Sequence, residues 1–421
     1  WSSDVCSSDL DELFNDWNDS NPFLWGPGWA SAMEIAVRLI NWAYTAAFLS
    51  ACHTEDGKMK QMLADLENGC ANMAAYIKVH RSRYSSANNH AIVEAAGLGI
   101  AGYIFSCVEW QDLAFSVLDE ALFAQNHPDG VNKEQSLHYQ LFGMEAYGLY
   151  LHTRMASGGG MPDGWREMLA ENCNYVRHCK ISNSNYVEFG DDDEGIILNL
   201  GGGKSDYPDY VLGLLSVLLD GSAKWCDDVS SVETVRWLFE RKSLDNANAK
   251  RLLPISDDVT FADGGVTLMR SNDGRISVAF DHGPLGFGTL AAHGHADALS
   301  IQVFVDGEPV VLDAGTYQYN GDAEARRHFR STLMHSTLML DGRDQSEMLG
   351  PFLWGKRAAT ALTGRSRHAV SAECVHASKA RHSRTLSLDD ARERLLLFDR
   401  WEASSEGLAT LILPANSKML D

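Results

Sequence analysis

Imidazole and carboxylate side chains gather in the stretch His293-Gly294-His295-Ala296-Asp297, and Asp313 and His335 follow further along the chain. Borderline metals such as zinc take imidazole and carboxylate ligands, and ligands from neighbouring strands can converge on one ion. Residues two apart in a strand face the same side, so strand geometry alone would make both His293 and His295 ligands. The structural alternative is a set of polar residues at the rim of a sheet.

An acidic segment, Gly190-Asp191-Asp192-Asp193-Glu194-Gly195, carries four consecutive carboxylates. Paired carboxylates are the acid and the base or nucleophile of glycosidases. The alternative, without a catalytic role, is a turn whose carboxylates are simply solvated. The segment lacks the full Asp-x-Asp-x-Asp-Gly calcium-loop pattern, so a calcium site is a poor explanation.

A third group of polar residues lies in Glu134-Gln135-Ser136-Leu137-His138-Tyr139. Gln135, His138 and Tyr139 are three and four residues apart, which predicts that they share one face of a helix. A tyrosine in such a place is otherwise an amphipathic core residue whose hydroxyl is satisfied.

Asn88-Asn89-His90 precedes a helical pattern, with Glu94 one turn later. Either an asparagine caps this helix, or Asn89 and His90 are donors at a helix N-terminus, where the dipole favours an anion such as a carboxylate.

Arg326-Arg327-His328-Phe329-Arg330 is a basic cluster in an acidic protein. It is either a solvated face or, beside the histidines, a place where an acidic substrate binds.

The elements that must position these residues are helical in the first half of the chain. Apolar residues recur at helical spacing in six segments separated by Gly-, Asp- and Asn-rich turns, which predicts paired helices in a bundle or toroid. The first follows the capping-box pattern Ser31-Ala32-Met33-Glu34 and runs from Met33 to Ala43. The others are Met59 to Val79, His90 to Trp110, Ser136 to Met155, Gly164 to His178 and Tyr210 to Leu219.

After a polar stretch that contains Pro254, the apolar period changes to two, which is typical of strands. Asp306-Gly307 is a hairpin dipeptide. The expected strands are Val266 to Met269, Ile276 to Phe280, Ile301 to Val305, Val310 to Asp313, Thr337 to Leu340 and Arg394 to Phe398. Several strands without intervening helices predict an antiparallel β-sandwich.

The sequence therefore predicts an α+β multidomain protein, in which an incomplete (α/α) toroid is followed by an antiparallel β-sandwich. The expected boundaries are a toroid over 11–245, a linker over 246–257 and a sandwich over 258–421. Residues 1–10 resemble the translated read-through of a sequencing adapter, and we expect them to be non-native. Both ends are expected to be truncated.

Charge and composition limit the function. The formal net charge of −22 over 421 residues argues against nucleic-acid or anionic-membrane partners and counts mildly against polyanionic substrates. No apolar run reaches the length of a membrane span. The cysteines form no C-x-x-C pair, so we expect buried small hydrophobes rather than a disulfide framework or metal site. Outside the adapter-like segment they are Cys52, Cys70, Cys107, Cys173, Cys179, Cys226 and Cys374.

The succession of these segments resembles the heparinase II/III-like polysaccharide lyases, which include heparinase III and related alginate lyases. The likeness runs through most of the chain, in order. Its residues are Asn21-Pro22, Trp25, Trp29, Ser31, Met33-Glu34, Arg38, Asn41-Trp42, Asn89-His90, Glu134-Gln135-Ser136, Tyr139, Gly190-Asp191, Asp193, His293 to Asp297, Asp313 to Tyr317, Phe329 to Thr332 and His335.

The resemblance implies β-elimination at a 4-linked uronic acid, with heparin or heparan-sulfate-like glycans as the first expectation and alginate as the second. Elimination requires neutralisation of the carboxylate, a base for the C5 proton and an acid for the leaving oxygen. By likeness, Asn89 and His90 would neutralise the carboxylate, Tyr139 would be acid and base, and His293 would be a second base or neutraliser.

The resemblance also implies a structural zinc held by His295, Asp313 and His335, which leaves His293 out of the ligand set. It implies that Trp25, Glu134, Gln135 and Arg330 line the substrate groove. A periplasmic or secreted location follows from the same likeness, and a homodimer is an open alternative to a monomer.

Two alternatives to the lyase remain. A glycoside hydrolase on the same toroid would use Asp191, Asp193 or Glu188 as its acid and base. A non-catalytic glycan-binding protein would keep the groove without turnover.

Overall fold

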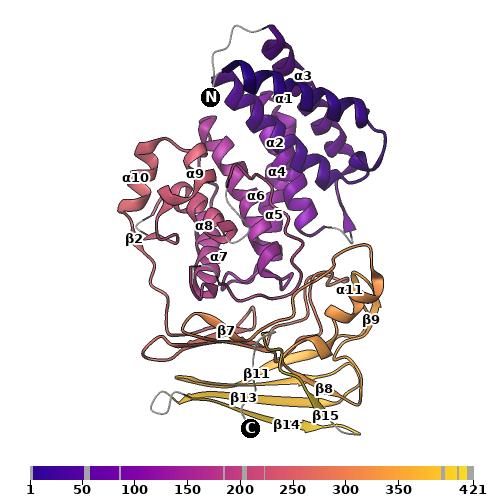
Figure 1. The fold of residues 1–421 in the computed structure, drawn as a ribbon, viewed down its shortest axis with the longest axis vertical. Coiled ribbons are helices and arrows are strands. Elements are labelled where there is room, and N and C mark those ends of the chain that lie inside the picture. The colour runs from indigo at the N-terminus through magenta and orange to yellow at the C-terminus, as the bar shows by residue number, and fades with distance from the viewer. Residues whose placement is uncertain are drawn as a thin grey trace. The chain divides into compact units, whose positions relative to one another are not determined.

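The computed structural model describes residues 3–51, 57–84, 87–183, 185–201, 206–221, 223–389, 394–404 and 407–414. Cys52, the first two residues of the adapter-like segment and residues 415–421 lie outside the described residues. Figure 1 shows the order of the elements: most helices come first and most strands follow, with one short strand among the later helices and one short α-helix among the strands.

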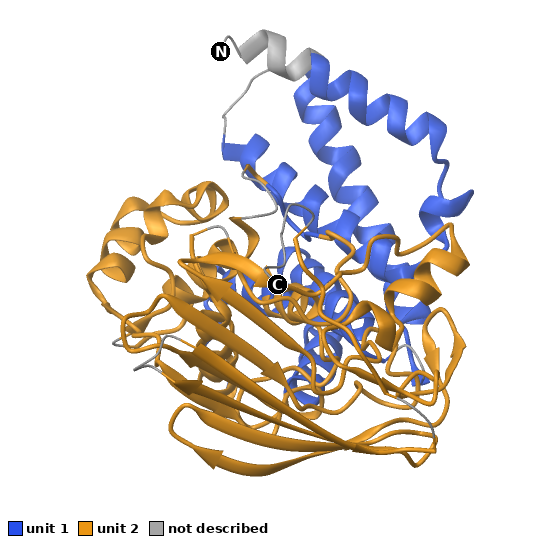
Figure 2. Cartoon of the chain, turned by 60° about the horizontal axis from the view of Figure 1, so that its bottom comes forward, with its two compact units in different colours: residues 1–122, 145–162, 196–199 blue, residues 123–144, 163–195, 200–421 orange. Residues whose placement is uncertain are grey.

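The chain forms two compact units, coloured in Figure 2. Unit 1 consists of residues 1–122, 145–162 and 196–199, and unit 2 of residues 123–144, 163–195 and 200–421. No described helix combines the length and the apolar character that crossing a membrane requires.

Long helices make up unit 1. The helices of the first 156 residues are α1 (Ser3–Ser20), α2 (Ala32–Ala51), α3 (Gly57–His80), α4 (Asn89–Ile104), α5 (Val108–Gln125) and α6 (Leu137–Ala156). Helix α2 packs against both α3 and α4. Gly97 of α4 lies so close to Ala36 of α2 that an added Cβ would be 3.1 Å from the alanine Cβ. The small side chain is therefore what allows these two helices to approach.

One predicted helix is in fact two. The pattern from His90 to Trp110 predicts a single helix, but α4 ends at Ile104 and α5 begins at Val108. Ser106 lies between them with φ +53°, a left-handed conformation that interrupts the helical hydrogen bonds. Neither Gly nor Pro marks this break, so the sequence pattern did not reveal it.

Unit 2 contains shorter helices and all the described strands. The helices are α7 (Trp165–Cys179), α8 (Tyr207–Leu218), α9 (Glu233–Leu238), α10 (Arg241–Ala249) and α11 (Ala323–Phe329). The strands are β1 (Ala223–Lys224), β2 (Arg251–Leu252), β3 (Asp258–Phe261), β4 (Val266–Arg270), β5 (Ile276–Asp281), β6 (Ile301–Val305), β7 (Glu308–Val311), β8 (Leu338–Leu340), β9 (Met348–Gly350), β10 (Leu353–Trp354), β11 (Ala359–Ser366), β12 (Ala369–Val375), β13 (Arg381–Asp389), β14 (Arg394–Glu402) and β15 (Gly407–Ala409).

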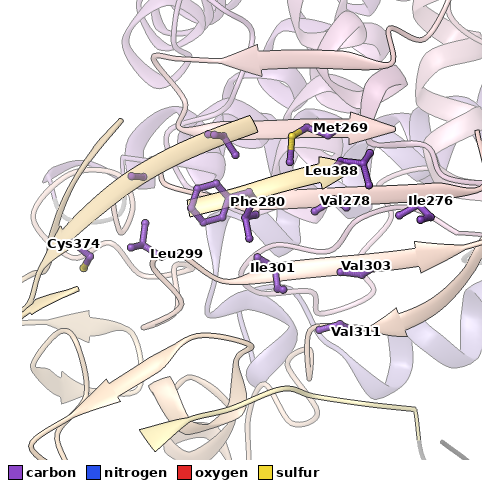
Figure 3. Packing of buried hydrophobic residues seen from close by; sticks show 13 residues of the cluster. Met269, Ile276, Val278, Phe280, Leu299, Ile301, Val303, Val311, Cys374 and Leu388 are labelled. Atoms are coloured by element: carbon purple, nitrogen blue, oxygen red, sulfur yellow. The ribbon is translucent and has the colours of Figure 1, made fainter. Parts of the chain in front are cut away.

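Two antiparallel sheets form a sandwich. One has the strand order β3-β4-β5-β6-β7 and the other the order β11-β12-β13-β14. Asp306 and Gly307, with φ +52° and +83°, form the turn between β6 and β7 that the sequence predicts. The core between the sheets combines Met269 of β4 and alternate residues of β5 and β6 with alternate residues of β12 and β13. Figure 3 shows this packing, with Phe280 of β5 and Leu388 of β13 among the labelled side chains.

The predicted fold class is confirmed: a helical first part is followed by an antiparallel sandwich. The last helix before the sandwich, α10, ends at Ala249, and β3 begins at Asp258. The described cysteines outside the first helix are free thiols, as expected, and five of these six are buried.

Candidate active site and metal centre

The first turn of α6 presents Tyr139 within unit 2. The helix begins at Leu137, and the hydroxyl of Ser136 accepts the Tyr139 N–H at 3.1 Å, which makes Ser136 the N-cap. The same hydroxyl donates to the Asp191 carbonyl oxygen at 2.6 Å. Gln135 precedes the cap with φ +56°, so it is outside the helix, and the prediction that it shares a helical face with His138 and Tyr139 is wrong.

The Tyr139 hydroxyl lies between a carboxylate and a second phenol. It donates to Asp193 Oδ2 at 2.9 Å and lies 2.8 Å from the Tyr319 hydroxyl. Burial, followed by the nearby Tyr319 and Asp193, raises the pKa of Tyr139, which is only 4% exposed. At rest the residue is therefore a neutral phenol, able to donate a proton.

His293 packs directly on Tyr139. Their ring centroids are 3.7 Å apart with an interplanar angle of 27°. Nδ1 of His293 lies 3.2 Å from Asp191 Oδ2, and Nε2 lies 3.4 Å from Glu134 Oε2. Both ring nitrogens thus face buried carboxylates, which fixes the plane of the imidazole against the phenol.

Asp191 is fully buried and is the most heavily shared group of the site. Its carboxylate receives both Nη1 and Nη2 of Arg326 and contacts His293 and, at 2.8 Å, Nε2 of His295. Burial alone would raise the pKa of Asp191, but the hydrogen bonds from the two histidines and Arg326 hold it well below its ordinary value. Asp191 is therefore a fixed anion that organises its neighbours.

The His138 ring lies between the carboxylates of Asp192 and Asp193. Nδ1 of His138 lies 3.2 Å from Asp192 Oδ1, and Nε2 lies 3.1 Å from Asp193 Oδ1. Burial would raise the pKa of Asp193, but the contact with His138 and the Gly195 N–H outweigh it and lower that pKa to about 2. The carboxylates of the acidic segment thus have side-chain partners, so the alternative prediction of a freely solvated turn does not describe it.

His295, Asp313 and His335 form a buried group that could hold a metal ion. One potential ligand atom from each lies within 4.8 Å of the other two. His335 Nδ1 is 2.7 Å from Asp313 Oδ2, and the two imidazole centroids are 5.2 Å apart. His293 is not part of this group, because residues 291–300 have no strand conformation and the strand-parity argument does not apply.

The donor set fits a cation. His295 Nδ1 and His335 Nε2 are buried polar atoms without a hydrogen-bond partner, and both residues have no exposed surface. Two imidazoles and a carboxylate are ligands that borderline divalent metals accept. Burying a ring nitrogen without a hydrogen-bond partner costs free energy, and coordination to a metal ion would give both nitrogens a partner.

A cavity of about 380 Å³ lies beside the acidic segment, with Gly190 and Asp192 in its wall. Its lining comes from the first turns of α6, the 186–192 segment, the start of α8 and Gly315. The polar groups on its wall include His138, Glu188 and Asp192, beside the aromatic rings of Tyr186, Phe189 and Tyr207.

The predicted carboxylate-binding residues belong to unit 1. Asn88 is the N-cap of α4, where its side chain accepts the His90 N–H at 3.4 Å. This confirms the capping interpretation of the Asn-Asn-His sequence. Asn89 is buried and His90 half-buried in the first turn, and Trp25 is 76% exposed. Their functional roles remain predictions.

The predicted groove residues of unit 2 have distinct environments. Glu134 is buried beside His293, and Gln135 is half-buried and donates to the Gly264 carbonyl oxygen at 3.2 Å. Arg330 is fully buried over the Trp354 ring, 4.5 Å from its centroid, and donates to the Gly350 carbonyl. Arg326 is buried too, so these two arginines of the basic cluster are internal rather than part of a solvated face.

Sequence reasoning missed three members of the site. Tyr319 follows the Asp313 to Tyr317 segment, but nothing in its spacing pointed to Tyr139. Arg326 was noted only as one of a basic cluster, and His138 only as a neighbour of Tyr139. The carboxylates that engage Arg326 and His138 lie 135 and 55 residues away, and such pairings need the folded chain.

Comparison with known proteins gives one family. The model described as "Heparinase II/III N-terminus" matches residues 13–197, and "Heparinase II/III-like, C-terminal" matches residues 254–414. A comparison with curated protein sequences finds no match.

Solved structures share the fold. A heparinase III crystal structure aligns with a TM-score of 0.70 at 16% identity, covering 94% of this chain and 59% of that one. A second heparinase III gene product gives 0.65 at 18%, covering 95% and 61%. The heparan sulfate lyase HepC from Pedobacter heparinus gives 0.60 at 16%, covering 95% and 59%. This chain thus spans about 59% of the length of the first of these structures.

Proposed function

We propose that this chain, which belongs to the heparinase II/III-like family, is a polysaccharide lyase that cleaves a 4-linked uronate glycan by β-elimination. The observation that carries the proposal is the Tyr139 hydroxyl, hydrogen-bonded to Asp193 and Tyr319 and stacked on His293. A phenol held between a carboxylate and an imidazole ring can exchange protons with a sugar.

In this mechanism Tyr139 takes the C5 proton and returns a proton to the leaving O4. The electrons of the C5–H bond pass into an enolate-like intermediate, so the uronate carboxylate must be neutralised. Asn89 and His90, at the N-terminus of α4, are the proposed neutralising groups by family likeness. His293, whose nitrogens face Glu134 and Asp191 and whose ring stacks on the phenol, is better suited to hold Tyr139 in place than to act as a free base.

The proposed substrate is an acidic glycan of the heparin or heparan sulfate kind, with alginate second. Two of the similar structures are heparinases III and a third is a heparan sulfate lyase, which supports this order. A secreted or periplasmic location and a groove lined by Trp25 and Gln135 belong to the same proposal. Glu134 and Arg330 are 3% and 0% exposed, so they would support the groove from beneath rather than line it.

A hydrolase is less consistent with the environments of Asp191 and Asp193, two of its three candidate carboxylates, while the third, Glu188, is exposed on the cavity wall. Asp191 is fully buried and engaged by both Nη atoms of Arg326, so it is not available to a substrate. Asp193 is held by His138 and Tyr139.

The test is product chemistry. Incubation of the full-length protein with a panel of acidic glycans should produce the ultraviolet absorbance of a 4,5-unsaturated uronate. Tyr139→Phe should lower kcat by about 100-fold or more, because it removes the proton donor. Glu194→Gln, an exposed change in the adjacent loop, is the matched control and should keep full activity. Saturated reducing ends, with Tyr139→Phe tolerated, would indicate the hydrolase, and binding without product the glycan-binding protein.

We assign zinc to His295, Asp313 and His335 as a structural ion, since zinc favours two imidazoles and a carboxylate. When bound, it would join three separate segments of unit 2 and take no part in proton transfer. Binding at a free concentration 100-fold above Kd would stabilise the fold by about 2.7 kcal/mol.

Elemental analysis should therefore find one zinc per chain, and a chelator should lower the melting temperature reversibly. Asp313→Asn should abolish both the zinc content and the response to chelator. His328→Gln, an exposed histidine in α11, is the control. A metal-free wild type whose melting is indifferent to added zinc would refute the assignment.

A further inference from the structure

We infer that Asp193 and His138 are positioning residues that enable Tyr139 to act as a base. This inference rests on the proposed lyase function and deepens it. The three side chains form a continuous series of contacts: Tyr139 hydroxyl to Asp193 Oδ2 at 2.9 Å, and Asp193 Oδ1 to His138 Nε2 at 3.1 Å.

The inference arises from a chemical requirement. A neutral phenol cannot accept a proton from C5 unless it gives up its own. Burial raises the pKa of Tyr139, and the neighbouring Tyr319 and Asp193 raise it further, so the phenolate form is not present at rest. The group that receives the phenolic proton must therefore lie within hydrogen-bonding distance of that hydroxyl.

Asp193 is suited to this task. Its Oδ2 already accepts the phenolic hydrogen, and it is held as a carboxylate by His138 and by the Gly195 N–H, which donates to Oδ1 at 3.1 Å. Among the described residues, the other hydrogen-bond partner of the Tyr139 hydroxyl is Tyr319, while the His293 ring stacks on the phenol face. Tyr319 is itself a phenol, and burial raises its pKa, so it stays neutral at rest and has no anionic oxygen to receive the proton.

The step balances without a further reactant. As the C5–H bond breaks, its proton bonds to the Tyr139 oxygen, and the phenolic proton moves to Asp193 Oδ2. The electron pair left on C5 then forms the C4–C5 double bond as the C4–O4 bond breaks. Tyr139 gives the C5-derived proton to O4 and takes its own proton back from Asp193, which restores the starting state.

His138 supports the carboxylate through this cycle. It is 8% exposed and lies between Asp192 and Asp193, whose side chains each keep 30% of their surface. Its ring is near those of Tyr207 and Phe142, and it lines the 380 Å³ cavity with Asp192. The imidazole lies beside Oδ1 as an electrostatic neighbour, and the Gly195 N–H donates to the same oxygen, so both contacts leave Oδ2 to the phenol.

The test is a double-mutant cycle with Asp193→Asn and Tyr139→Phe, in which kcat and KM are measured separately. Asp193→Asn keeps a hydrogen-bond acceptor but cannot take the proton, so it should lower kcat by about 100-fold with KM nearly unchanged. In the Tyr139→Phe background the same change should have little further effect, because both residues act in one step. Asp193→Glu should recover part of kcat, and Glu194→Gln is the control.

A pH profile separates this role from a structural one. Removing the negative charge of Asp193 favours the phenolate, so the alkaline limb of kcat should move to lower pH in Asp193→Asn. His138→Gln should lower kcat less than Asp193→Asn does. If Asp193→Asn is unstable, the second measurement is the solvent isotope effect on the wild type. Its kcat should be lower in deuterated than in light water, because the phenolic proton exchanges with solvent.

Three outcomes are decisive against the inference. They are a near wild-type kcat in Asp193→Asn, a larger loss in Tyr319→Phe than in Asp193→Asn, and an absent solvent isotope effect in the wild type. A wild type that forms no unsaturated product from any uronate polymer would overturn the proposed function as well. If the wild type is active and any of these three outcomes is found, only the positioning role of Asp193 and His138 is overturned.

Discussion

Asp191 contacts both the candidate catalytic histidine and a candidate metal ligand. His293 and His295 occupy different oxygens of its carboxylate, and Arg326 bridges both oxygens from α11. A buried anion is tolerated only when it is paired and hydrogen-bonded, and here three partners satisfy it. The loss of its charge would leave Arg326 buried without a counterion.

Asp191→Asn should therefore destabilise the protein at neutral pH by about 3–5 kcal/mol, the usual cost of breaking a buried ion pair. The folded-state pKa of Asp191 lies below its unfolded value of about 3.9, so its contribution is fully present above that pH and is lost as the pH falls through the folded-state pKa. Urea unfolding at a series of pH values should thus show a steeper acid loss in the wild type than in Asp191→Asn.

Asp245→Asn is the control for that experiment, because Asp245 pairs with Arg241 on an exposed helix surface. It should change stability little at any pH. Equal acid slopes in the wild type and Asp191→Asn would show that Asp191 is not the group whose protonation matters.

At this scale, sequence alone could identify residue types but not their partners. His295, Asp313 and His335 do lie together, and Tyr139 does lie against His293. The resemblance to a family supplied these groupings. Strand parity, used alone, would have put His293 in the metal site, because it assumed a strand where the chain forms a loop. Tyr319 and Arg326 had no local pattern to mark them.

Among the elements, the crossing of the acidic segment with the start of α6 determines where Tyr139 lies. Gly190 has φ +62°, and a Cβ there would lie 2.4 Å from the Gln135 carbonyl oxygen and 2.6 Å from that of His293. The Asp191 N–H also donates to the His293 carbonyl oxygen at 2.9 Å. Gly190 thus allows three segments that carry site residues to meet.

Gly190→Ala should consequently lower stability and activity by more than the left-handed backbone conformation at position 190 alone explains. Gly274→Ala is a matched control: its φ is +75°, but nothing lies within 4 Å of the added Cβ. The control should cost about 1–2 kcal/mol, the penalty of a left-handed alanine. Gly190→Ala should cost clearly more and lower kcat, as thermal unfolding and the lyase assay would show. Equal effects of the two changes would mean that the 190 segment moves aside at little cost.

The strands show why some elements are readable from sequence and others are not. Strands β4 to β6 have continuous apolar or alternating residues and fall where the sequence predicts them. In β13 two of the inward positions are His382 and Arg384, which the apolar pattern does not count. Both bind Asp399 of β14, Arg384 through two hydrogen bonds of 2.8 and 2.9 Å, so a paired charge substitutes for apolar burial.

For the whole molecule, the large negative charge opposes the acidic substrate that we propose. The formal net charge is −22, and among the described side chains of the site Arg326 and His138 are already paired with aspartates. Long-range repulsion should slow the approach of a polyanion, while short-range contacts within the groove bind it. The two contributions can be separated because salt screens the repulsion between distant exposed charges much more than it screens close or buried contacts.

Raising the ionic strength from about 0.01 M to about 0.15 M shortens the Debye length from about 30 Å to about 8 Å and should remove most of this repulsion. KM for an acidic glycan should therefore fall over that range, while kcat should change little, because proton transfer at the buried Tyr139 is shielded from bulk ions. Steady-state rates of unsaturated product across the salt series would measure both constants. A protein whose groove binds the glycan mainly through unpaired cations would show the reverse, a KM that rises steeply with salt, and that result would mean that local positive charge outweighs the acidic surface.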